Sequence, residues 1–146
     1  MSVVLLDLNV LISLIDPAHP THDAAHGWFA RNRESGWATC PITENGCIRV
    51  LSSPKYPTTG TTAARAAAMM REIRGNSDHV FWPDEISIAD ANRFVADFVA
   101  GHQQVADVYL LGLAVHHAGR LATFDRGIPW RAVVGATADH LEVIGE

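Results

Sequence analysis

The chain has 146 residues, of which 48% are hydrophobic and 18% are charged, and its formal net charge is −5. These values predict a single globular domain over 1–146 and exclude a disordered chain, and no apolar stretch reaches the roughly 18 residues of a membrane span. The negative charge argues against a broad basic face for nucleic acid, but not against an enzyme that meets phosphates through a metal ion and a few arginines. Without a basic leader, and with two cysteines in no metal-binding spacing, the sequence predicts a cytoplasmic protein.

Strand and helix patterns alternate along the chain. Short apolar runs between turn residues predict strands at 3–6, 37–40, 80–82, 121–124 and 141–144. Helical periodicity and helix-forming composition predict helices at 8–15, 22–33, 43–51, 61–74, 87–100 and 105–118. The segment 52–60, SSPKYPTTG, has the composition of a loop. This alternation predicts right-handed crossovers and a mostly parallel sheet with helices on both faces.

Residues typical of helix ends support three of these boundaries. Thr43 is the expected N-cap of the helix at 43–51. Ser87 and Asp90 have the spacing of a capping box at the start of 87–100. Gly119 is placed to end the helix at 105–118.

Four acidic residues fall where strands end or helices begin. Asp7 follows the first strand, Glu44 and Asp107 lie in the first turns of helices, and Asp125 follows the strand LATF. Each has an ordinary explanation, because a carboxylate at a helix N-terminus gains about 0.3–1 kcal/mol and Asp125 suits an Asx-turn. If they converge, neighbours about 4 Å apart repel by roughly 4 kcal/mol per pair at an effective dielectric of 20. Such a cluster requires raised pKa values or a bound cation.

A cation held only by carboxylate oxygens would be a hard divalent ion that keeps some of its waters. Such an ion makes a bound water a better nucleophile and neutralises charge on a phosphate. Asn9 is expected to point its amide at this site, holding a water or a carboxylate, or else simply to start the helix.

Three segments of the chain resemble the PIN-domain ribonucleases, and in particular the VapC toxins of toxin–antitoxin pairs. They are VVLLDLNVLISL, ITENGCIRVLSSP and HQQVADVYLLGLAVHHAGRLATFDRGI, which occur in the family's order over residues 3 to about 145. The resemblance implies a three-layer α/β/α sandwich, Mg²⁺- or Mn²⁺-dependent endoribonuclease activity on tRNA or rRNA, a homodimer, and inhibition by a VapB-type antitoxin. The family's acidic positions fall on Asp7, Glu44, Asp107 and Asp125, and Asn9 matches a position that is commonly small and polar.

The resemblance assigns roles to these residues. Asp7, Glu44 and Asp107 would hold the metal, partly through water, and Asp125 would orient or deprotonate the attacking water, leaving a 5′-phosphate and a 3′-hydroxyl. Two departures are visible: Ala106 stands where the family often has threonine, and no further acid follows Asp125. We therefore expect one well-bound ion and a second that arrives with RNA.

Several other residues have two possible roles. Arg126, Arg49 and Lys55 are candidate phosphate contacts or ordinary surface charges, and Trp130 is a candidate base-stacking residue or a packing residue. The alanine-rich helix at 61–74 could form a dimer face, a groove for an antitoxin helix, or part of the core.

Two other functions compete with the ribonuclease. A haloacid-dehalogenase-type phosphatase is disfavoured, because Asn9 replaces its second acid and Lys55 is the only lysine. A non-catalytic PIN-like module that binds RNA or protein is the remaining alternative, and the four retained acids argue against it.

Overall fold

The computed structural model describes residues 2–57 and 60–145, and it forms one five-stranded sheet of order β3-β2-β1-β4-β5. Every neighbouring pair of strands is parallel. The strands are β1 (Val4–Leu6), β2 (Trp37–Thr39), β3 (His79–Phe81), β4 (Arg120–Thr123) and β5 (Leu141–Val143). The helices are α1 (Leu8–Ile15), α2 (His22–Asn32), α3 (Pro41–Leu51), α4 (Ala63–Arg74) and α5 (Val105–His116). The predicted parallel sheet is confirmed.

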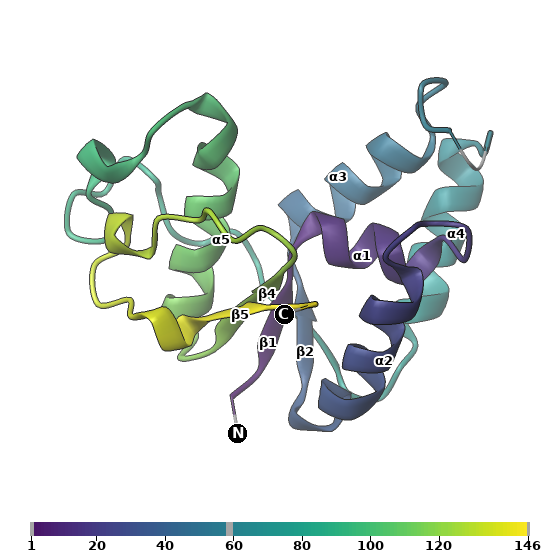
Figure 1. Ribbon diagram of the computed structural model, residues 1–146, viewed down its shortest axis with the longest axis horizontal. Helices are drawn as coiled ribbons and strands as arrows, with labels where there is room; N and C mark the ends of the chain where they lie inside the picture. The colour runs from purple at the N-terminus through teal and green to yellow at the C-terminus, as the bar shows by residue number, and fades with distance from the viewer. Residues whose placement is uncertain (1, 58–59, 146) are drawn as a thin grey trace.

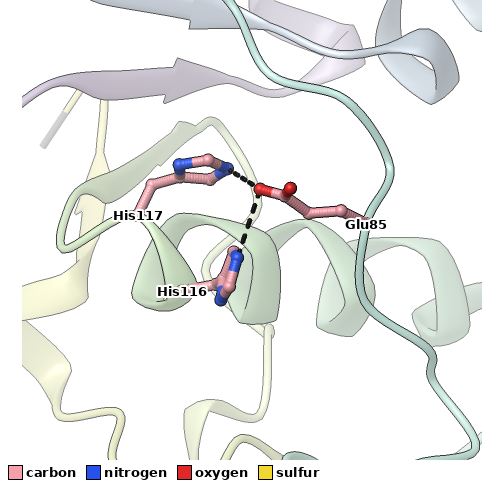
Figure 2. Close-up of side chains that lie close together, drawn as sticks. All are labelled: Glu85, His116 and His117. Atoms are coloured by element: carbon pink, nitrogen blue, oxygen red, sulfur yellow. Dashed lines mark hydrogen bonds and ion pairs between the residues drawn. The ribbon is translucent and has the colours of Figure 1, made fainter.

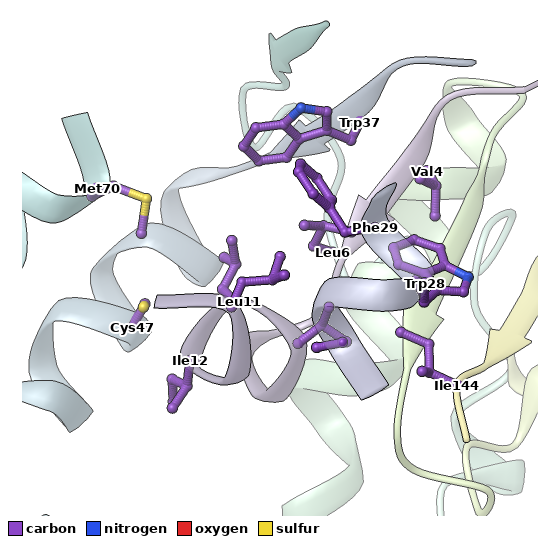
Figure 3. Close-up of a cluster of buried hydrophobic side chains, with 14 of the residues drawn as sticks. Val4, Leu6, Leu11, Ile12, Trp28, Phe29, Trp37, Cys47, Met70 and Ile144 are labelled. Atoms are coloured by element: carbon purple, nitrogen blue, oxygen red, sulfur yellow. The ribbon is translucent and has the colours of Figure 1, made fainter. Parts of the chain in front are cut away.

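The helices cover both faces of this sheet, which gives the predicted three-layer sandwich. Helices α1 to α4 lie on one side, and α5 with the segments that follow β3 and β4 lies on the other (Figure 1). The first layer packs large side chains such as Trp28, Phe29 and Trp37 against the sheet (Figure 3). Phe29 and Trp37 meet edge to face, with ring centroids 5.2 Å apart.

The sequence of strand β1 is continuously apolar because its side chains are buried on both faces of the sheet. Val4 and Leu6 belong to the core under α1 to α4, whereas Leu5 belongs to the core under α5. All three side chains are fully buried. A central strand of a parallel sheet covered on both faces has no solvent side, so alternation disappears from its sequence.

The predicted helix at 87–100 is wrong. Ser87 and Asp90 instead accept hydrogen bonds from the backbone N–H groups two residues ahead, at 3.1 and 2.9 Å, and so form turns. Phe94 pairs with Val133 in an antiparallel bridge, and only Ala96–Phe98 forms a short 3₁₀ turn. Side chains of Ser and Asp offer the backbone an alternative to helical hydrogen bonds, and burial of Phe94 stabilises that alternative here.

Two predicted helix ends also need correction. Helix α3 begins at Pro41 with Cys40 as its N-cap, and Thr43 is the third helical residue, whose hydroxyl accepts from the Cys40 N–H at 3.1 Å. After α5, the left-handed position is taken by Ala118, with φ of 56°. Gly119 is needed for a different reason, because a Cβ there would lie 2.4 Å from the Val3 carbonyl oxygen.

The remaining predicted elements agree with the structure to within two residues. Residues 58 and 59 of the predicted loop lie outside the described part of the chain. Among the described residues, none of the helices combines the length and the apolar character needed to cross a membrane.

Candidate active site

The sheet topology brings three of the predicted acidic residues to neighbouring strands. Glu44 follows β2, Asp7 follows β1 and Asp125 follows β4, and these strands are adjacent and parallel. The carboxyl ends of parallel strands lie at one edge of a sheet, where sites of open α/β folds form. Asp107 reaches this region from the first turn of α5.

Asp7 is the most enclosed of the four, with 4% of its surface exposed. Its Oδ1 accepts a 2.7 Å hydrogen bond from the Leu8 N–H, and its Oδ2 accepts a 2.7 Å hydrogen bond from the Thr123 hydroxyl. Asp7 is therefore the N-cap of α1 as well as a site residue. Burial raises the pKa of Asp7, and the negative charge of Asp125 adds to this, while the two hydrogen bonds oppose the rise.

Asp107 and Asp125 lie close enough to interact directly. Burial is the main cause of a rise in the pKa of Asp107 to about 7, followed by the negative charge of Asp7 and by the charge and side chain of Asp125. We call Asp7, Asp107 and Asp125 the carboxylate triad.

Thr123 contacts two residues of this triad, Asp7 and Asp125, and the sequence analysis missed it. Besides donating to Asp7, its fully buried hydroxyl accepts a 3.0 Å hydrogen bond from the Asp125 N–H. The Asn9 amide lies 3.5 Å from the same hydroxyl, and Asn9 Oδ1 lies 3.4 Å from the Phe124 N–H. Asn9 therefore contacts the end of β4 that carries the triad. Asp125 also forms the predicted Asx-turn, accepting from the Gly127 N–H at 2.7 Å.

Glu44 has a different environment from the triad. Its Oε2 accepts a 2.6 Å hydrogen bond from Thr39, and its Oε1 lies 3.2 Å from Nη1 of Arg74. Thr39 in turn lies 2.8 Å from Nε2 of His79. Burial and the Arg74 charge lower the pKa of His79 to about 4, so this ring is neutral at pH 7 and can donate to Thr39. The structure thus orients Glu44 toward Thr39 and Arg74.

The triad fits a hard divalent cation. Its carboxyl groups offer only oxygen atoms. Burial is the main cause of the raised pKa values of Asp7 and Asp107, and the negative charges of neighbouring carboxylates add to the rise. A divalent cation would remove this penalty, and Mg²⁺ typically takes one or two carboxylates directly.

The other predicted site residues lie at two separate hollows on the surface. Arg126 and Trp130 follow Asp125 and line a hollow of about 310 Å³ with Phe98, while the Arg131 guanidinium lies 4.7 Å from the Trp130 ring centroid. Arg49 and Lys55 line a separate hollow at the far end of α3. These two are therefore separated from the triad by the length of that helix.

An apolar groove that the sequence did not reveal lies beside Asp107. It measures about 640 Å³ and is lined by Ile42, Ile86, Ile88, Val105, Ala106 and Tyr109, among others. Three of its side chains, Ile42, Ile88 and Val105, are 39–43% exposed. Exposed branched apolar side chains around one hollow are typical of a binding surface.

The sequence of this fold and site matches a known family model. The model described as PIN domain matches residues 4–133. This chain belongs to the PIN-domain family. It is 41% identical over 140 residues to ribonuclease VapC44 of Mycobacterium tuberculosis, covering 96% of this chain and 98% of the relative. It is 40% identical to ribonuclease VapC39 of the same species, covering 90% of this chain and 94% of the relative.

Solved structures support the same PIN-domain fold. The crystal structure of VapBC2 from Rickettsia felis, bound to a promoter DNA fragment, aligns with a TM-score of 0.62 over 97% of this chain and 98% of that one. Mycobacterium tuberculosis VapC20, described as a toxin that cleaves the sarcin–ricin loop, aligns with a TM-score of 0.62 over 91% of this chain and 98% of that one. Both are 11% identical in sequence, so they support the fold alone.

Proposed function

We propose that this chain, as a single PIN domain over 1–146, is the toxin of a toxin–antitoxin pair and a divalent-metal-dependent endoribonuclease. The observation that carries the proposal is the carboxylate triad, in which burial and the charges of Asp7 and Asp125 raise the pKa of Asp107 at the edge of the sheet where Asp7 is buried. The relatives with 40–41% identity are named ribonucleases, which supports the same reaction class.

Each acidic residue has a role in this proposal. Asp7 and Asp107 would hold Mg²⁺ or Mn²⁺, and Asp125 would orient the attacking water or accept its proton. The ion supplies positive charge to the phosphate and lowers the pKa of a water molecule. Glu44 would join the metal site through water once its pairing with Arg74 loosens. Because Glu44 pairs with Arg74 and no further acid directly follows Asp125, we propose one well-bound ion and a second that arrives with RNA.

The proposed role of Asp125 also predicts which ends the cleaved RNA will carry. A water positioned by Asp125 needs no help from the RNA 2′-hydroxyl, so hydrolysis leaves a 5′-phosphate and a 3′-hydroxyl. Arg126 directly follows Asp125 and lines one hollow with Trp130, and these two residues are the candidates for a phosphate contact and a stacked base. Arg49 and Lys55 would contact RNA only if the strand continued along α3.

A protein partner is the second part of the proposal. The solved relative from Rickettsia felis is a VapBC complex, and we propose a VapB-type antitoxin and a homodimer for this chain. Helix α4 buries Ala66 and Met70 in the core, while Met69 and Ile73 line a hollow with residues of α1. Part of α4 is therefore core, and its other side is available to a partner. A toxin of this kind would act on tRNA or rRNA in the cytoplasm.

The deciding experiment uses antitoxin-free protein with a panel of tRNA and rRNA. We expect cleavage with Mg²⁺ or Mn²⁺, loss of cleavage with EDTA, and loss in Asp7→Asn. Mapping of fragment ends should show 5′-phosphates. Equal cleavage by wild type and Asp7→Asn, or binding without cleavage throughout the panel, would favour the non-catalytic module instead.

A further inference from the structure

Three side chains that can bind metal gather at the opposite end of α5 from the carboxylate triad. Glu85, from the segment after β3, points toward His116 and His117 at the end of α5 (Figure 2). Glu85 Oε1 lies 3.2 Å from Nε2 of His116 and 3.1 Å from Nε2 of His117. The three ligand atoms all lie within 4.8 Å of one another. Asp107 is about 14 Å away along the helix axis, so the two groups are separate.

The spacing of these atoms suits a tetrahedral ion. With Zn²⁺ bonds to nitrogen and oxygen of about 2.0–2.1 Å, two ligand atoms of a tetrahedral site lie roughly 3.3 Å apart. Both oxygen-to-nitrogen distances here are close to that value. Two imidazoles and one carboxylate form a ligand set that zinc uses when it keeps one coordination position open.

His117 gives an independent indication of a ligand. Its Nε2 is buried, and although it lies 3.1 Å from Glu85 Oε1, it has no aligned hydrogen-bond partner in the described part of the chain. Trp82 stacks on the ring at a centroid distance of 4.3 Å and an interplanar angle of 11°, which fixes its orientation. A neutral imidazole held in this orientation can coordinate an ion through a ring nitrogen.

We propose that Glu85, His116 and His117 form a Zn²⁺ site with an open fourth position. Glu85 has a side chain that is 43% exposed, so water can reach the ion. The site would tie the segment after β3 to α5. Asp84 and Ile86, the neighbours of Glu85, line the apolar groove beside the triad. Zinc would therefore stabilise one wall of that groove.

Arg93 competes with the ion for His116. Its Nη1 lies 3.1 Å from Nδ1 of His116, and because a guanidinium only donates, Nδ1 accepts and the ring proton sits on Nε2. Coordination through Nε2 moves that proton to Nδ1 and displaces Arg93. Arg93 is 40% exposed and also pairs with Asp90 at 3.5 Å, so it can turn away.

The test is calorimetric titration of the full chain with Zn²⁺ in excess Mg²⁺, which occupies the triad. We expect one site per chain and tetrahedral absorption bands when Co²⁺ replaces Zn²⁺. Glu85→Gln and His116→Gln keep side-chain size and should weaken binding by more than the roughly 10–100-fold loss that follows removal of an outer-shell partner. His26→Gln, at an exposed position on α2, should bind like wild type. Arg93→Gln should bind more tightly.

Results that would overturn the proposal are equally specific. They are no zinc binding, zinc binding that Glu85→Gln and His116→Gln leave unchanged, or weaker binding in Arg93→Gln. If a variant does not fold, ¹⁵N shifts of the histidine rings in wild type decide the matter. Zinc must then shift Nε2 of both His116 and His117, and unmoved resonances reject the site. None of these readouts depends on ribonuclease activity.

Discussion

The hydroxyl of Thr123 donates a 2.7 Å hydrogen bond to the carboxylate of Asp7, 116 positions earlier in the chain. The same hydroxyl accepts from the backbone of Asp125. One buried oxygen atom therefore positions two of the three carboxyl groups, and β1 and β4 are held in register at the end where the triad lies.

Replacement of Thr123 by Val should disturb both stability and activity. Val keeps the shape but removes the donor to Asp7, and a buried carboxylate that loses a partner costs about 1–3 kcal/mol. We expect urea unfolding to show a loss in this range and RNA cleavage to fall at least tenfold. Thr123→Ser retains the hydroxyl and should keep most of the activity. Equal activity in the Val and Ser variants would show that the hydroxyl does not position the triad.

Asp107→Asn should make the metal-free protein more stable at pH 7 while abolishing cleavage. The pKa of Asp107 is about 7 in the folded protein against 3.8 for an ordinary aspartate. Between these values the folded protein binds more protons than the unfolded chain, so stability falls as pH rises through that window. Asn imitates the protonated form and removes the repulsion, which should add roughly 1 kcal/mol at pH 7. Urea unfolding with EDTA at pH 5 and pH 7 checks this.

The control for that variant is Asp97→Asn, at an exposed position outside the triad. Its stability should follow the wild-type pH dependence. If Asp107→Asn has the same pH slope as wild type, the titration of Asp107 does not contribute to stability.

Mg²⁺ should stabilise the protein more at pH 7 than at pH 5. Protons compete with the ion for Asp7 and Asp107, whose pKa values are raised. Ion affinity should fall roughly tenfold per pH unit for each proton displaced. Melting temperatures with and without Mg²⁺ at both pH values measure this difference. An equal shift at both pH values would place the ion outside the triad.

The sequence predicted the sheet because its signals are local. The run VVLL, the break at Asp16 and Pro17, and the apolar periodicity of α5 need no distant partner to be read. The positions of the acidic residues followed from the parallel topology, since strand ends share an edge. The family resemblance then assigned the acidic residues their roles.

The contacts between distant residues could not be predicted in the same way. Thr39 and Thr123 end β2 and β4, and nothing in one sequence shows which carboxylate a buried hydroxyl will meet. The helix predicted at 87–100 is absent for a related reason. Ser87 and Asp90 have the spacing of a helix start, but Phe94 pairs with Val133, 39 positions away, and this pairing is incompatible with a helix. Long-range pairing overrides local propensity in such segments.

Gly119→Ala should destabilise the fold strongly. Its added Cβ would lie 2.4 Å from the Val3 carbonyl oxygen, which is backbone and cannot move aside. We expect a loss of more than about 2 kcal/mol in urea unfolding. Gly27→Ala is the matched control, because this glycine lies within α2 and its added Cβ meets only the flexible end of Arg31 at 3.4 Å. That change should stabilise by about 0.5–1 kcal/mol. A small effect at Gly119 would contradict the close approach of β1.

Arg74→Gln should tighten binding of the divalent ion. Arg74 lies 3.2 Å from Glu44, whose side chain is only 13% exposed, and its guanidinium also lies 5.0 Å from the Phe81 ring centroid. Removal of this positive charge frees Glu44 to face the cation and lowers the local positive potential. A partly exposed ion pair contributes up to about 1 kcal/mol, which corresponds to a gain of up to about fivefold in Mn²⁺ affinity by calorimetry. Arg71→Gln, on an exposed position one turn earlier in α4, should leave the affinity unchanged. Weaker ion binding in Arg74→Gln would mean that Arg74 positions Glu44 for the ion instead of competing with it.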